Sequence, residues 1–133
     1  RANPRPDDGP PGPAAKEVAM NQAHGGLGEL LVIVYLGIAI ASWILARRQG
    51  LPPWLTGTAH ALLGVQIIMG IILYVQHPNI MPWTHVLFGL LTIPALLLVI
   101  PLRQRIGRNA AIAVSSAAAG LCALVAVIIA MTR

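Results

Sequence analysis

The stretch Ala110–Met131, AAIAVSSAAAGLCALVAVIIAM, decides the class of this protein. It contains no side chain that is charged at neutral pH, and its length suits a bilayer, whose hydrocarbon core a helix of about 20 residues crosses. Lipid offers no water to a backbone amide, so a spanning segment satisfies its polar groups internally by forming a helix. The stretch therefore predicts a transmembrane helix.

Three further apolar stretches precede it, at residues 28–46, 54–75 and 83–102, and Glu29 is the only Asp, Glu, Lys or Arg inside them. The turns between the stretches are short, and short turns make consecutive helices antiparallel neighbours. We therefore predict an all-α integral membrane protein, in which residues 23–133 form an up-down bundle of four transmembrane helices.

Composition excludes a soluble domain. Hydrophobic residues make up 56% of the 133 residues and charged residues 10%, and the mean hydropathy is +0.74. Soluble domains carry about 25% charged residues because their surfaces face water. Lipid is therefore expected to be part of the solvent of this chain.

Residues 1–22 precede the bundle and are predicted to be an extramembrane arm. Five of the eleven prolines lie in residues 1–13, and such a run favours an extended, polyproline-like conformation. We expect helical character to begin near Ala14. The arm has two possible roles, as a free tail or as a contact with a neighbouring membrane subunit.

The arginines predict the orientation in the membrane. They gather in the first turn, at 47–48, and in the third turn, at 103–108, whereas the second turn, at 76–82, has no Lys or Arg. The positive-inside rule places the Arg-rich turns in the cytoplasm and both chain termini outside. We expect a multi-pass protein of the bacterial cytoplasmic membrane. The high pI of about 10.8 then reflects topology and not binding to nucleic acid.

One short pattern, small-His-x-x-apolar-Gly, occurs three times: at residues 23–28, 59–64 and 84–89. Each copy lies at the start of a predicted span. Residues i and i+4 share one face of a helix, so each glycine lies one turn from its histidine. We interpret the glycine as room for a flat ring against the backbone, as a porphyrin or chlorin needs when imidazole binds its metal.

Topology predicts which histidines can cooperate. His24 and His85 begin helices that run in the same direction, so they lie at similar depth near the outer surface. These helices are diagonal in an up-down bundle, about 12–14 Å apart, a span that two imidazoles and an iron fill. His60 enters from the opposite face and is either a structural hydrogen-bonding group or a lone ligand to a five-coordinate pigment. His77, in the second turn, is expected to face solvent.

Residues 62–70, the following turn and residues 83–91 resemble one half of a haem A synthase. In that family a four-helix half-bundle has a Gln-x-x-x-Gly helix, here Gln66 and Gly70, and then a helix that opens with a haem-ligating histidine, here His85. The partner histidine opens the helix two spans earlier, where His24 stands. The family has two such halves and this chain has one, and its outer-loop glutamate lies before the histidine, whereas Glu29 follows His24. The resemblance implies a haem b-binding half-bundle and not a complete synthase.

The sequence thus predicts a membrane haem protein or haem-bearing accessory subunit of a respiratory or photosynthetic electron-transfer complex, and not a stand-alone enzyme. The candidate cofactor-binding residues are His24, Gly28, His60, His85 and Gly89, with His24 and His85 as the metal ligands. Two alternatives stay open. One is a structural subunit without cofactor, which contacts other membrane subunits through the arm and the small residues 115–120 of the last span. The other is a subunit that binds a chlorophyll-type pigment.

Overall fold

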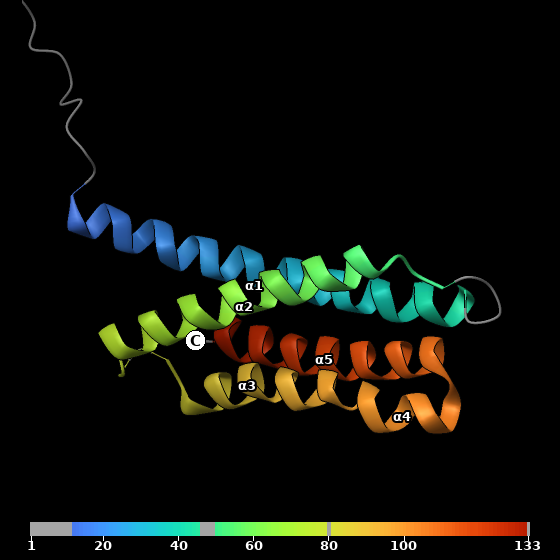
Figure 1. Cartoon of the computed structure of the whole chain (residues 1–133). Coiled ribbons are helices and arrows are strands. Elements are labelled where there is room, and N and C mark those ends of the chain that lie inside the picture. Colours follow the sequence, from blue (N-terminus) through green and yellow to red (C-terminus); the bar gives the residue numbers. More distant parts are fainter. Residues whose placement is uncertain (1–11, 46–49, 80, 133) are drawn as a thin grey trace, which may run out of the picture.

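The computed structural model describes residues 12–45, 50–79 and 81–132, and these residues form long helices joined by short connections (Figure 1). The helices are α1 (Pro13–Ile44), α2 (Pro53–Gln76), α3 (Trp83–Leu97), α4 (Val99–Ile106) and α5 (Arg108–Met131). Because α3 and α4 together form the third span, the described residues contain four helical segments long and apolar enough to cross a membrane. The predicted all-α fold of a multi-pass membrane protein is confirmed. Residues 1–11, the first half of the predicted arm, lie outside the described residues.

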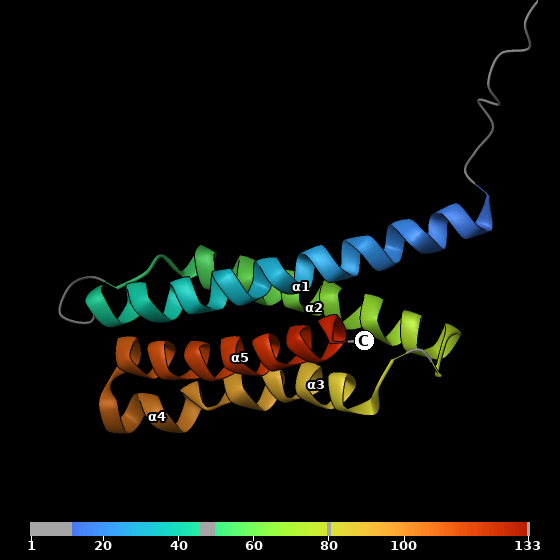
Figure 2. The ribbon, with the colours of Figure 1, turned by 180° about the vertical axis from the view of Figure 1, so that it is seen from behind.

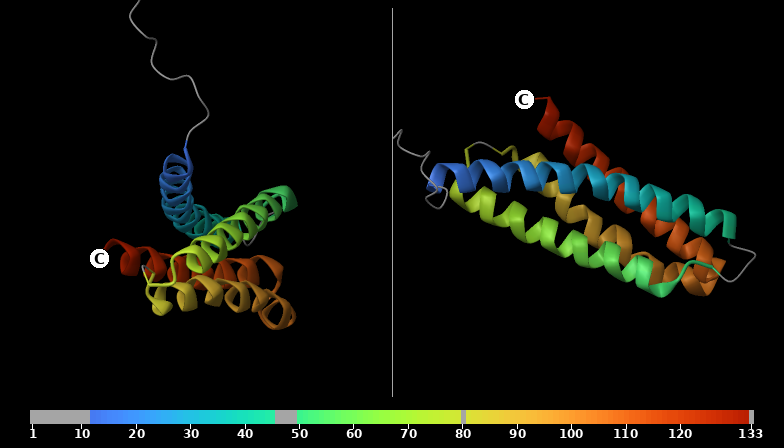
Figure 3. Two further views of the ribbon diagram at one scale, coloured as in Figure 1. Left: turned by 90° about the vertical axis from the view of Figure 1, so that its left-hand side faces the viewer. Right: turned by 90° about the horizontal axis from the view of Figure 1, so that it is seen from above.

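α5 has the most central position in the bundle. It packs along α1 on one side and along α3 and α4 on the other (Figures 1 and 2). α2 packs against α1 and touches α3 at only a few positions. Seen along the bundle, α1 and α3 therefore lie on opposite sides of it (Figure 3). This is the neighbour order predicted for an up-down bundle, except that the contact between α2 and α3 is loose.

α1 is longer than the span predicted from the sequence. It starts at Pro13, a residue suited to the first helical turn because it has no N–H to leave unpaired, and it continues through Gly25 and Gly26 without a break. Its 32 residues correspond to about 48 Å at 1.5 Å per residue, which exceeds the hydrocarbon core of about 30 Å. The first turns of α1 therefore overhang the bundle (Figure 1).

The third span is interrupted at Leu98, and it ends at Ile106 instead of at the predicted residue 102. The arginines predict a turn over residues 103–108. In the structure, α4 instead extends to Ile106, and Gly107 alone separates it from α5. Gly107 has a φ of 84°, in the region that favours glycine. The interruption at Leu98 follows from Pro101, which has no N–H for the carbonyl of Leu97 and clashes with it.

Small residues make the interface between α1 and α5 close. The buried residues of α5 are mostly small: Ala111, Ala113, Ser115, Ser116, Ala119, Gly120 and Ala126. At Gly120 a Cβ atom would lie 3.0 Å from Leu36 Cδ2 and 3.4 Å from the Leu36 backbone nitrogen. The small residues at 115–120 thus serve packing inside the bundle.

The outer surface of the bundle is apolar. Large exposed side chains occur on every helix and include Trp43, Trp54 and Trp83, each about two-thirds exposed. Such a surface is compatible with contact to lipid acyl chains, and tryptophans are typical of the headgroup layers at the ends of spans.

Candidate functional site

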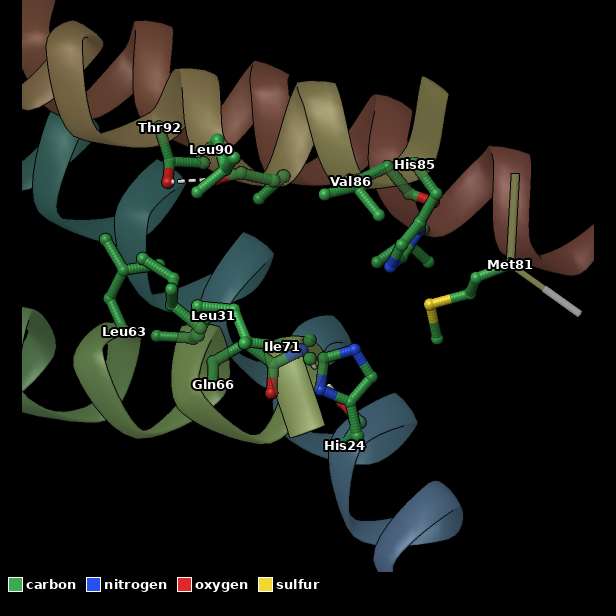
Figure 4. Close-up of a pocket in the computed structure, with 17 residues that line it drawn as sticks. His24, Leu31, Leu63, Gln66, Ile71, Met81, His85, Val86, Leu90 and Thr92 are labelled. Carbon is green, nitrogen blue, oxygen red and sulfur yellow. Dashed lines mark hydrogen bonds between the residues drawn. The ribbon is translucent and has the colours of Figure 1, made fainter. Parts of the chain in front are cut away.

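A cavity lies between α1, α2, α3 and α5 at the end of the bundle where α1 overhangs, and we call it the histidine cavity (Figure 4). Its volume is about 90 Å³, and its walls are mainly aliphatic side chains and glycines. The polar side chains in its lining are His24, Gln66, His85 and Thr92. The exposed residues of the lining are Ile71 on α2 and Leu90 on α3, and these two helices touch at few positions, so the cavity opens between them.

His24 and His85 meet in this cavity. His24 comes from α1 and His85 from the first turn of α3, and the two side chains extend toward each other across the cavity (Figure 4). Their ring centroids are 6.1 Å apart, and the ring planes make an angle of 67°. His24 is 6% exposed, and His85 is partly buried. The structure therefore brings together the two histidines that the sequence analysis pairs.

The ring of His85 is oriented by a hydrogen bond to α5. Its Nδ1 atom donates to the backbone carbonyl of Ala126 at 2.8 Å. A neutral imidazole carries one N–H, so this bond places the proton on Nδ1 and leaves the lone pair on Nε2. A histidine that binds a metal through one nitrogen commonly donates its other N–H to a carbonyl in this way.

The ring of His24 has no hydrogen-bond partner for either nitrogen among the described residues. A buried polar atom without a partner is uncommon in proteins and calls for a physical explanation. The Oε1 atom of Gln66, which lines the same cavity, is also buried without a partner in the described part of the chain. Three unpaired polar atoms thus gather at one end of an apolar cavity.

α1 and α2 interlock around His24. The Nε2 atom of Gln66 donates to the backbone carbonyl of His24 at 3.0 Å, so a side chain of α2 is bonded to the backbone of α1. A Cβ on Gly28 would lie 3.1 Å from Gln66 Nε2, and a Cβ on Gly70 would lie 3.0 Å from His24 Cε1. Gln66 therefore packs over Gly28 of α1, one turn from His24. His24 in turn packs over Gly70 of α2, one turn from Gln66.

The glycines of the repeated pattern have different surroundings. The space at Gly28 is taken by Gln66, so this glycine does not leave an open face next to His24. A Cβ on Gly89 would meet no atom within 4 Å, and Gly89 lines the cavity. Of the two glycines that follow His24 and His85, Gly89 is therefore the one with open space above it. Gly70, whose role depends on the packing of α1 against α2, is a cavity residue that the pattern did not identify.

His60 lies apart from the histidine cavity. It is exposed on α2, and its ring centroid is 6.2 Å from that of the buried Tyr35. The adjacent Gly64 has open space around it. The structure thus places His60 and Gly64 on the surface of the bundle and does not join them to His24 and His85.

A second, smaller group of polar residues lies next to the cavity, where α1 overhangs. His77 Nε2 and Glu17 Oε1 are 2.5 Å apart, and both side chains are partly exposed. They line a pocket of about 120 Å³ together with Met81, which also lines the histidine cavity. The first turns of α1 are thereby tied to the connection between α2 and α3.

No protein-family model, curated protein or solved structure matches this chain. The resemblance to haem A synthases therefore depends on the quoted sequence motifs. Within the described residues there is also no group of three or more His, Cys, Asp or Glu side chains that could hold a metal ion. A metal bound by His24 and His85 would therefore need its other ligands from groups other than the described His, Cys, Asp and Glu side chains.

Proposed function

We propose that this chain is a membrane haem-binding protein, with His24 and His85 as the two axial ligands of a haem b, and that it acts as an electron-transfer or accessory subunit of a larger respiratory or photosynthetic complex. The observation that carries the proposal is the facing pair of imidazoles in an apolar cavity, 6.1 Å apart. Two metal–nitrogen bonds of about 2 Å each, with the ring radii added, give a separation of roughly 6 Å between ring centroids.

The hydrogen bonds of the two rings support this proposal. His85 has its proton held on Nδ1 by Ala126 and thus offers Nε2 as a ligand. Both nitrogens of His24 are free of partners among the described residues, so one of them can bind a metal without losing an existing bond. A metal between the rings would satisfy one of the two buried His24 nitrogens that now have no partner among the described residues.

The charge of the cavity favours a macrocycle over a bare metal ion. The described lining contains no Asp, Glu or Cys, so a bare divalent cation would be buried without an opposing charge, at a cost of several kcal/mol. A porphyrin supplies two negative charges of its own, which make its ferrous complex neutral at the metal. It also supplies four further nitrogen ligands, which the described lining of the cavity does not offer.

The size of the cavity sets a condition on this fit. Pockets for small organic ligands typically have about 300–1,000 Å³, and the histidine cavity has about 90 Å³. A macrocycle would therefore hold its metal between the histidines and extend through the open side between α2 and α3. Gly89 and the loose contact between α2 and α3 leave that direction free.

Two axial histidines leave no open coordination position on an iron. Oxygen or substrate then has no place to bind at the metal, so this ligation favours electron transfer over oxygen chemistry. Because the site lies near one end of the bundle, an iron bound there would be close to one membrane surface, where a redox partner could approach. We infer from the arginines that this is the outer surface, with both chain termini on the same side.

The test is a visible absorption spectrum of the detergent-purified full chain, oxidised and then reduced, together with a haemin titration of the same samples. We expect sharp bands of reduced haem that are lost in His24→Ala and in His85→Ala. His77→Ala is the matched control, because it removes a histidine at the same end that does not line the cavity, and it should keep the bands.

Each other outcome points to a different function. A far-red band that is insensitive to reductant and depends on a single histidine would indicate a chlorophyll-type pigment. A preparation from native membranes that has no chromophore and binds no haemin would overturn the proposal and leave a structural subunit. Bands that persist in both cavity variants would move the haem away from His24 and His85.

A further inference from the structure

We propose that Gln66 is the positioning residue for His24: in the loaded site Gln66 Oε1 accepts the N–H of His24 Nδ1, and this bond directs His24 Nε2 to the metal. The inference rests on the proposed function, because it concerns the same site. It adds a role for α2, which otherwise contributes no candidate ligand to the cavity.

The unpaired atoms of the cavity carry this inference. His24 has a donor and an acceptor nitrogen, both buried and unpartnered, and Gln66 Oε1 is a buried acceptor that is also unpartnered within the described residues. Once a metal takes Nε2, the proton of a neutral His24 must be on Nδ1 and needs an acceptor. Tyr35 and Ser42 also have unpartnered hydroxyls, but neither residue lines the cavity. Gln66 Oε1 is thus the unpartnered acceptor of the described lining.

Gln66 is already held beside His24. Its Nε2 donates to the His24 carbonyl at 3.0 Å, and Gly28 leaves the space that this amide occupies. The last torsion angle of a glutamine side chain is broad, so the amide can turn to bring Oε1 toward the ring without moving the backbone. Gly70, one turn from Gln66, lies against the ring itself.

The arrangement would give the two ligands equivalent support. His85 Nδ1 donates to a backbone carbonyl of α5, and His24 Nδ1 would donate to a side-chain amide of α2. Hydrogen bonds of this kind fix the tautomer and the orientation of a ligand and increase its basicity, and their loss commonly weakens metal binding 10- to 100-fold. A more basic ligand favours the ferric state and thus lowers the reduction potential.

The experiment compares Gln66→Leu, Gln66→Glu and Gln76→Leu in the haem-loaded full chain, with haemin affinity and midpoint potential as readouts. Gln66→Leu removes the acceptor, so we expect haemin affinity to fall by roughly 10- to 100-fold and the midpoint potential to rise. A tenfold larger loss in the ferric than in the ferrous state corresponds to about 59 mV. Gln66→Glu keeps an acceptor of the same length, so it should restore the affinity and lower the potential.

Gln76→Leu makes the same chemical change at an exposed position at the end of α2, and it should match the wild type in both readouts. The inference is overturned if Gln66→Leu keeps the wild-type potential, or if it loses haemin and Gln66→Glu does not restore it, since Gln66 would then act in packing alone. Should Gln66→Leu fail to fold, the potential of Gln66→Glu decides, because an unchanged value contradicts the proposed bond.

The same samples separate the two proposals. If His24→Ala binds haem as the wild type does, the proposed function fails at its ligand, whatever Gln66 does. If His24→Ala and His85→Ala lose haem while Gln66→Leu retains both affinity and potential, only the role of Gln66 fails.

Discussion

The two sides of the bundle are built from different residues and differ in how closely their helices pack. Where α1 meets α5, small side chains bring the backbones together, and Gly120 lies against Leu36. Where α2 faces α3, the helices touch at few positions, and a cavity with two histidines lies behind the opening. We call these regions the close side and the open side.

The difference indicates what each side is for. Lipid is as apolar as leucine, so helices in a membrane associate through close packing and hydrogen bonds rather than through burial of apolar surface. The close side meets this requirement within the chain. The open side does not, and both nitrogens of the buried His24 lack partners among the described residues. A ligand that binds between α2 and α3 would supply the missing contacts.

The largest effect on stability is expected on the close side, for Gly120→Leu. A Cβ atom added at Gly120 would lie 3.0 Å from a side-chain atom of Leu36, and overpacking of this kind costs about 1–3 kcal/mol. Gly37→Leu is the control, because Gly37 is exposed with open space around it and gains the same helix propensity. The free energy of unfolding in mixed detergent measures the difference. Equal stabilities would show that the close side is not tightly packed.

On the open side, Gly89→Leu should leave stability nearly unchanged and weaken haemin binding. The space above Gly89 is free in the structure, so a leucine fits without a clash but occupies the path of the macrocycle. We expect at least a tenfold loss of haemin affinity, about 1.4 kcal/mol. Gly64→Leu adds the same side chain at an open position outside the cavity. If both variants bind haemin equally well, the macrocycle does not lie over Gly89.

A smaller effect is expected for Gly70→Ala, at the boundary between the two sides. The new Cβ would lie 3.0 Å from His24 Cε1 and push the ring away from its preferred rotamer, which costs about 0.5–1.5 kcal/mol. Haemin titration should show weaker binding by that amount. Gly25→Ala, an exposed position on α1 with free space, is the control. Tighter or equal binding in Gly70→Ala would mean that His24 is not held against α2.

The sequence predicted the close side well, since its signals are local. Uncharged stretches of about 20 residues gave the four spans, short connections gave their order, and the small residues 115–120 indicated a close approach. The break in the third span was not predicted. α3 continues through Pro94 and ends at Leu97, whose carbonyl has no N–H to accept from at Pro101.

The site was predictable only in part. Equal depth and diagonal placement were enough to pair His24 with His85, because both follow from topology. The partners of these side chains were not predictable, since Ala126 and Gly70 enter the site through the packing of helices far apart in sequence. The repeated pattern alone does not distinguish His60 from the other two histidines, because a motif on one helix does not indicate which neighbour it will face. Topology separated His60 from the pair, and in the structure it lies exposed beside Tyr35.

The smallest effect is expected for His60→Ala, and this variant tests whether the repeated pattern or the surrounding helices define the site. His60 has the same local sequence as His24 and His85 but lies exposed beside Tyr35, outside the cavity. Since it contributes nothing to the histidine cavity, its removal should leave the reduced haem bands and the haemin affinity unchanged. Loss of a far-red band in this variant alone would instead assign a pigment to His60, as the single-ligand alternative requires. Loss of the haem bands in His60→Ala would contradict the His24/His85 pairing, because ligation would then follow the local sequence pattern and not the position in the bundle.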